Sequence, residues 1–331
     1  MRNPIESTLV GVGFIVKPRS FVKEKLKNYE SPPPFKLLTF DTRVLRMKKN
    51  FSLPKVLLAL VTLLAFSLPA IAYQEINVQS GGTIQGKAKM FGKMPSPRYY
   101  HLILFPNIDM CAEVDTDDEM NRVLDDFKIS PDGGLKDVVI TLEHVEAGKP
   151  FNKEPILITS ENCKFFPDVN VIRQGEAFKI DNLDAVMHNS QVYQKERGKI
   201  LLNIPIPAEE VSDGKVNFKK KYKIMQMICG MHEFMQTWGF RVQNPYYFIT
   251  DLDGNFNIGD IPPGEYVVNA WHYLMKPQKR KIKIVAGETI DLKFEFDADR
   301  VVRPLYETIK SGRIKKDAVY PGTAKGKELG R

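Results

Sequence analysis

Residues 225–235 read MQMICGMHEFM, and the fold expected for the whole chain follows from them. They place a thiol at Cys229, an imidazole at His232 and a thioether at Met235, three residues apart in each case. Soft ligands of this kind favour copper over calcium, magnesium or manganese. Two histidines, one cysteine and a weak axial methionine describe a blue-copper electron-transfer site, so a second histidine is needed from elsewhere.

The second histidine is expected to be His188, in KIDNLDAVMHNS at residues 179–190. This N-x-D-x-x-x-H-N pattern resembles the end of the cupredoxin strand that supplies the first copper histidine. The later C-x-x-H-x-x-M resembles the loop that supplies the other three ligands. Together they resemble the plastocyanin-like, mononuclear branch of the cupredoxins. The resemblance implies a Greek-key β-sandwich with one type 1 copper at His188, Cys229, His232 and Met235.

The spacing of the methionine departs from that family, because in plastocyanins it lies further beyond the histidine. H-x-x-M resembles instead the dinuclear copper site of terminal oxidases, which needs two cysteines. Met225 stands where the first of them would be, and the gap from cysteine to histidine is one residue shorter. One copper is therefore favoured. The thioethers that compete with Met235 for the axial position are Met187, Met225, Met227 and Met231.

The formal charge of +8 is concentrated near the two ends of the chain. Residues 1–72 hold 12 Lys/Arg against 4 Asp/Glu, and residues 299–331 hold 9 against 4. The 27 basic and 32 acidic residues that remain give residues 73–298 a charge of −5. No nucleic-acid partner is expected, because the folded part has no basic excess.

Residues 47–72, MKKNFSLPKVLLALVTLLAFSLPAIA, have the basic start, apolar centre and A-x-A-like end of a signal peptide. The unbroken apolar run at 56–66 is too short to cross a bilayer. We therefore expect a periplasmic or otherwise extracytoplasmic protein with no stable membrane span after cleavage; an uncleaved anchor is the alternative. Residues 1–46 are interpreted as a disordered leader or a start codon placed too early.

Three cysteines in an exported protein leave one thiol unpaired, because export favours disulfides. If Cys229 binds a metal, Cys111–Cys163 is the expected disulfide, although sequence alone does not fix the pairing.

Short β-branched runs bounded by Gly, Pro, Asn and Asp predict an all-β sandwich over residues 82–243, with a possible helix only at 119–127. Asn244-Pro245 marks an expected boundary. Residues 244–297 resemble a carboxypeptidase-regulatory-like, transthyretin-type β-sandwich, through TDLDGNFNIGDIPPGEY at 250–266. Residues 298–331 form a basic tail, expected to be disordered or a docking arm.

The expected function is that of an electron carrier that exchanges electrons with a redox partner protein, or receives copper from a donor. The apolar shell around the copper is expected to consist of Phe234, Trp238 and Phe240. Phe234 and Met235 are expected to form part of an apolar docking patch around the metal edge. Asn189 is expected to hydrogen-bond to the ligand loop. The alternative is a non-redox module for copper binding or trafficking, or for binding a protein or glycan. No enzyme is expected, because the other histidines, His101, His144 and His272, are too scattered for a second copper cluster.

Overall fold

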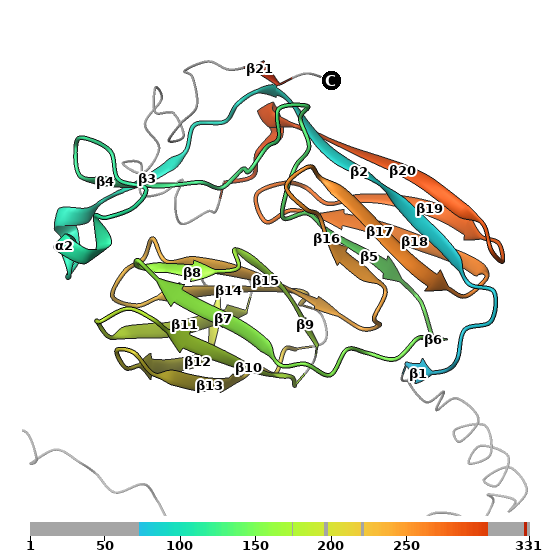
Figure 1. Cartoon of the computed structure of the whole chain (residues 1–331), viewed down its shortest axis with the longest axis horizontal. Coiled ribbons are helices and arrows are strands. Elements are labelled where there is room, and N and C mark those ends of the chain that lie inside the picture. The colour runs from blue at the N-terminus through green and yellow to red at the C-terminus, as the bar shows by residue number, and fades with distance from the viewer. Residues whose placement is uncertain (1–72, 174, 195–197, 220–221, 304–327, 330–331) are drawn as a thin grey trace, which may run out of the picture. The chain divides into compact units, whose positions relative to one another are not determined.

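The computed structural model describes residues 73–173, 175–194, 198–219, 222–303 and 328–329 (Figure 1). The predicted leader and signal peptide lie outside these residues, as does most of the basic tail. Nearly every described element is a strand, as predicted, and none of the described helices is long and apolar enough to cross a membrane.

The first β-sandwich, called here the ligand sandwich, is built from consecutive strands. One sheet has the order β13-β10-β7-β8 and the other β12-β11-β14-β15-β9, with parallel pairs β10–β7 and β15–β9. The bounds are β7 Ile156–Glu161, β8 Lys164–Phe166, β9 Val169–Arg173, β10 Ala177–Asn182, β11 His188–Gln194, β12 Lys199–Ile206, β13 Val211–Lys215, β14 Ile224–Cys229 and β15 Gln236–Val242.

The core of the ligand sandwich follows from the two-residue period of its strands. In β10, Phe178 and Ile180 are buried and their neighbours Ala177 and Lys179 are exposed. Both faces of β14 are largely buried, and its alternate residues Met225, Met227 and Cys229 belong to the core of this sandwich. Each such large apolar side chain contributes about 1.5–3 kcal/mol through burial.

The second β-sandwich, called here the split sandwich, takes strands from both sides of the ligand sandwich in the sequence. Its sheets have the orders β16-β5-β18-β19 and β17-β2-β20. Figure 1 shows the blue β2 between the orange β17 and β20, from opposite ends of the colour scale. The bounds are β2 Gly82–Lys93, β5 Val139–Glu143, β16 Tyr247–Ile249, β17 Asn255–Ile261, β18 Gly264–Trp271, β19 Gln278–Ile284 and β20 Thr289–Asp297.

This pairing corrects the expected boundaries of 82–243 and 244–297. The apolar face of β2, with Ile84, Ala88 and Met90, packs into the same core as Phe294 of β20. A short alternating strand shows which face is buried but not which distant strand it pairs with. Sequence order therefore assigned β2 and β5 to the wrong sandwich. The ligand sandwich is an insertion between β5 and β16.

A further excursion between β2 and β5, residues 98–124, is called here the cap segment. Antiparallel strands β3 (Arg98–His101) and β4 (Asn121–Leu124) enclose η1 (Leu102–Leu104) and α2 (Ile108–Cys111). The helix considered for residues 119–127 is wrong, because β4 pairs with β3. The expected Cys111–Cys163 disulfide is confirmed, and it joins the cap segment to the ligand sandwich.

An aromatic cluster lies where strands of the two sandwiches meet. Trp238 stacks on Tyr273 with ring centroids 5.4 Å apart, and Phe240 packs on Trp271 at 5.1 Å. Trp238 and Phe240 were expected to surround the metal, but they belong to this cluster and not to the core that contains Cys229. The remaining elements are β1 Gln74–Glu75, β6 Ala147–Gly148, η2 Ala298–Arg300 and β21 Glu328–Leu329.

Candidate metal centre

Strand register brings the expected ligands to one end of the ligand sandwich. Ser190 of β11 lies opposite Cys229, the last residue of β14, and His188 is two residues before Ser190 on the same face. The turn after β14 is short, because the Cys229 N–H donates to the Met235 carbonyl at 3.0 Å and the Met235 N–H donates to the His232 carbonyl at 2.9 Å. His232 is thereby placed beside His188.

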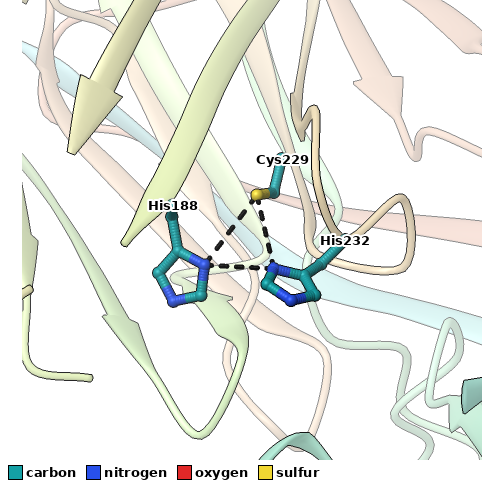
Figure 2. A group of neighbouring side chains, drawn as sticks. All are labelled: His188, Cys229 and His232. Carbon is teal, nitrogen blue, oxygen red and sulfur yellow. Dashed lines mark hydrogen bonds between the residues drawn. The ribbon is translucent and has the colours of Figure 1, made fainter. Parts of the chain in front are cut away.

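Three of the predicted ligands come together as a small triangle (Figure 2). The Nδ1 atoms of His188 and His232 are 3.3 Å apart, and the Cys229 Sγ lies 3.8 and 3.7 Å from them respectively. All three residues are fully buried. A trigonal ion at typical bond lengths of about 2.1 Å to nitrogen and 2.3 Å to sulfur would hold these atoms roughly 3.6 and 3.8 Å apart. The donor triangle therefore fits one metal ion.

The outer nitrogen of His188 is held by a buried carboxylate. Asp184 Oδ2 lies 2.7 Å from His188 Nε2, and the same carboxylate accepts backbone N–H bonds from Asn162 at 2.6 Å and Cys163 at 3.0 Å. A carboxylate behind a histidine ligand fixes the tautomer and orients the ring. The sequence pattern contains Asp184, but no role was predicted for it.

The outer nitrogen of His232 is held by the cap segment. His232 Nε2 lies 3.1 Å from the Pro106 carbonyl, a partner that the sequence did not indicate. The ring of the neighbouring Phe234 packs edge-on against Phe105 at 5.2 Å, and the Arg122 guanidinium lies 5.0 Å from its centroid. The prediction of a docking patch at Phe234 and Met235 is therefore wrong, because both side chains are buried, with exposed fractions of only 3 % and 1 %.

The cluster favours a thiolate beside an imidazolium when no metal is bound. Burial opposes ionisation of Cys229, but hydrogen bonds from His188, His232 and the Asn189 N–H outweigh it and lower the pKa of the thiol to about 6. Burial likewise lowers the pKa of His188, but the hydrogen bonds to Asp184 and Cys229 outweigh this and raise it to about 9. A metal ion needs the thiolate form of cysteine, which this environment stabilises.

Asn189 connects to the ligand loop through its backbone. Its N–H donates to Cys229 Sγ at 3.4 Å, and its carbonyl accepts the Gly230 N–H at 2.7 Å. Its side-chain amide donates to the Ile204 carbonyl on β12 at 3.4 Å. The expected hydrogen bond from Asn189 to the ligand loop is therefore confirmed, and it is made by the backbone.

The fourth predicted ligand, Met235, and the histidines outside the triangle have the following positions. Met235 is buried in the same core as Cys229, and its role as axial ligand stays a prediction. Cys163, Asp184 and His188 also lie close together, but Cys163 is in a disulfide and has no thiolate to offer. His101 and His144 are exposed, and His272 is buried in the loop after β18.

Comparisons with known proteins give weak likenesses only. No family model matches, and no curated protein matches. Solved structures that resemble part of the chain include a copper nitrite reductase from Thermus scotoductus SA-01, with 15 % identity, a TM-score of 0.24, and coverage of 29 % of this chain and 24 % of that one. A purple cupredoxin from Nitrosopumilus maritimus shares 18 % identity, with a TM-score of 0.23 and coverage of 26 % and 99 %. A point mutant of amicyanin in its reduced state shares 16 %, with a TM-score of 0.23 and coverage of 31 % and 98 %. At these scores the side chains alone carry the functional argument.

Proposed function

We propose that the chain is an exported copper protein that carries single electrons, with one copper held by His188, Cys229 and His232 and an axial Met235. The observation that supports this most is the buried N₂S triangle, with sides of 3.3, 3.7 and 3.8 Å. Imidazole and thiolate ligands in a trigonal set suit copper, and divalent copper binds such sites more tightly than zinc.

The protein would contribute a cage that changes little between oxidation states. His188 is held by Asp184 and His232 by the Pro106 carbonyl, while Cys229 lies at the end of a paired strand. Side chains locked by packing and hydrogen bonds keep their positions when the charge at the site changes. Bound copper would supply one-electron chemistry, cycling between its +1 and +2 states.

Export is supported by the Cys111–Cys163 disulfide, because disulfides persist in oxidising compartments and are rare in the cytosol. The predicted signal peptide at 47–72 agrees with this placement. We propose a periplasmic or other extracytoplasmic location and a redox protein as the partner.

The test is a titration of the protein, residues 73–331, with Cu(II), followed by visible absorption and electron paramagnetic resonance. We expect an intense thiolate-to-copper band that saturates at one equivalent and is absent in Cys229→Ser. Cys229→Ser keeps the side-chain size but removes the thiolate. Weak absorption that is the same in both proteins would overturn the proposal.

A copper-trafficking role is the second candidate. It is favoured by the buried Met225 and Met227, two soft thioethers that belong to the same core as Cys229. Soft ligands select Cu(I). A carrier of this kind would bind Cu(I) tightly without a stable oxidised form, whereas an electron carrier would show a reversible oxidation in voltammetry.

A further inference from the structure

The outer face of the cap segment exposes large apolar side chains. The exposed fractions are 77 % for Ile103, 74 % for Leu104 and 45 % for Met120. Met120 is held beside the other two, because the Leu102 N–H donates to its carbonyl at 3.0 Å. Adjacent apolar residues exposed to this degree are costly in water, and a contiguous patch of them marks an interaction site.

This apolar face lies directly outside the metal centre. Leu104 precedes Phe105, whose ring packs edge-on against Phe234 at 5.2 Å. Pro106 follows, and its carbonyl lies 3.1 Å from His232 Nε2 while the residue itself is exposed. One residue of the cap segment therefore bridges the buried imidazole and the surface.

The cap segment that carries this apolar face is acidic. No lysine or arginine occurs between Tyr99 and Asn121, and six acidic residues do. Asp115 is paired with Lys164 at 2.6 Å, but Asp109, Glu113 and Asp118 are exposed to solvent. Charges around an apolar centre steer a partner of opposite sign and set its orientation.

We propose that the cap segment is the docking surface for a basic redox protein, with Ile103 and Leu104 at its centre and Asp109, Glu113 and Asp118 at its rim. The charge selects this partner over two others. A second copy meeting at the same face would oppose like charges, because a two-fold interface pairs each surface with itself. An anionic membrane would repel the same acids.

The inference rests on the proposed function, since a docking face for a redox protein matters only if the buried cluster exchanges electrons. The two are tested separately by measuring binding with the metal-free protein. The probe is a basic c-type cytochrome, titrated by calorimetry and by nuclear magnetic resonance shifts, with an acidic c-type cytochrome as the comparison. The copper titration described above tests the cluster independently.

Two variants test the surface. Neutralising the rim with Asp109→Asn, Glu113→Gln and Asp118→Asn is expected to weaken binding of the basic cytochrome roughly tenfold, at about twofold per exposed ion pair. Replacing Ile103 and Leu104 by serine is expected to weaken it by a similar factor while the salt dependence persists. The matched control neutralises three exposed acids of the split sandwich region, Glu146, Glu265 and Glu288, and is expected to leave binding unchanged.

The expected nuclear magnetic resonance result is a set of shifts confined to the cap segment. Equal binding by the rim variant and the control would overturn the proposal. So would equal binding of the acidic cytochrome, or self-association of the chain through Ile103 and Leu104. If the copper titration fails while the cap segment still binds the basic cytochrome selectively, the proposed function falls and the docking surface stands.

Discussion

Two regions of the molecule hold fully buried histidines, and their surroundings are opposite in kind. His188 in the ligand sandwich has the Asp184 carboxylate at 2.7 Å on one nitrogen and faces Cys229 with the other. His272, beside the split sandwich, stacks on Phe127 at 5.1 Å and Tyr273 at 4.4 Å. Its Nδ1 accepts the Leu274 N–H at 3.2 Å.

These surroundings shift the pKa values of the two histidines in opposite directions. Burial lowers the pKa of His272 to about 3, and the nearby Asp126 does not outweigh it. The pKa of His188 rises to about 9, because Asp184 and Cys229 outweigh the same burial effect. Burial of a histidine therefore does not indicate a ligand; its hydrogen-bond partners do.

The largest expected effect comes from removing one histidine of each kind. His188→Ala takes away a donor of the triangle, and we expect its copper affinity to fall by more than about 100-fold. His272→Asn is the control, because Asn can still accept the Leu274 N–H. Its copper affinity is expected to stay within about twofold, since distant sites act independently. Chelator competition measures both, and equal losses would contradict the distinction.

Asp184→Asn tests whether the carboxylate partner distinguishes the two histidines. The amide keeps the shape of the side chain but removes its charge, so we expect copper affinity to fall about 10–100-fold. Asp213→Asn, at an exposed position of β13, serves as the control and is expected to change nothing. An unchanged affinity in Asp184→Asn would show that His188 is positioned by packing alone.

The lowered pKa of His272 predicts that the free energy of unfolding depends on pH. Its pKa is about 3 in the folded protein and about 6.5 in an unfolded chain, so above pH 6.5 the ring is neutral in both states and its ionisation costs no stability. As the pH falls from 6.5 towards 3, only the unfolded state takes up the proton, and stability is lost at about 1.4 kcal/mol per pH unit.

Urea unfolding of the metal-free protein at pH 7 and pH 5 measures this loss. The groups facing His272 are Asp126, itself paired with Arg98, and the phenol of Tyr273. We expect His272→Asn to lose about 2 kcal/mol less than the unmodified chain over this interval. His144→Asn, at an exposed histidine, is the control. The same loss in all three proteins would show that His272 does not titrate in this way.

Met235→Leu is expected to change the free energy of unfolding only slightly but to change the spectrum of the bound copper. The two side chains have similar volumes, so unfolding should change by less than about 1.5 kcal/mol. If the thioether is the axial ligand, the visible band and the reduction potential shift. Met225→Leu, which is also buried in the same core, should leave both unchanged. Identical spectra in the two variants would remove Met235 from the ligand set.

The parts of the site that the sequence could predict are those encoded locally. Cys229 and His232 are three residues apart, so one turn fixes their relation, and His188 stands at the end of a recognisable strand pattern. Asp184 could not be identified, because a loop carboxylate four residues before a histidine is usually solvated. Pro106 acts through its carbonyl, a group that every residue carries.

The parts of the fold that escaped prediction depend on pairing between distant segments. β2 is parallel to β20, with Ile84 opposite Ile290. The sequence of neither strand identifies the other as its partner. The all-β class could be predicted from the alternation within each strand. Trp238 and Phe240 were assigned to the metal because of their position near the ligand loop, although strand alternation turns them towards the aromatic cluster.

The insertion of the ligand sandwich has a consequence for the order in which the chain folds. Strands β5 and β16 pair antiparallel, with Thr141 opposite Tyr247, so the two ends of the inserted segment are neighbours. Synthesis or export from the N-terminus releases β2 and β5 long before β16 to β20. The inserted sandwich has all its strands earlier, and its folding would bring β5 and β16 together and shorten the loop that the outer sandwich must close. The split sandwich is then the later of the two sandwiches to become stable. A truncation after β18 would remove its strands β19 and β20 and leave all strands of the ligand sandwich in place.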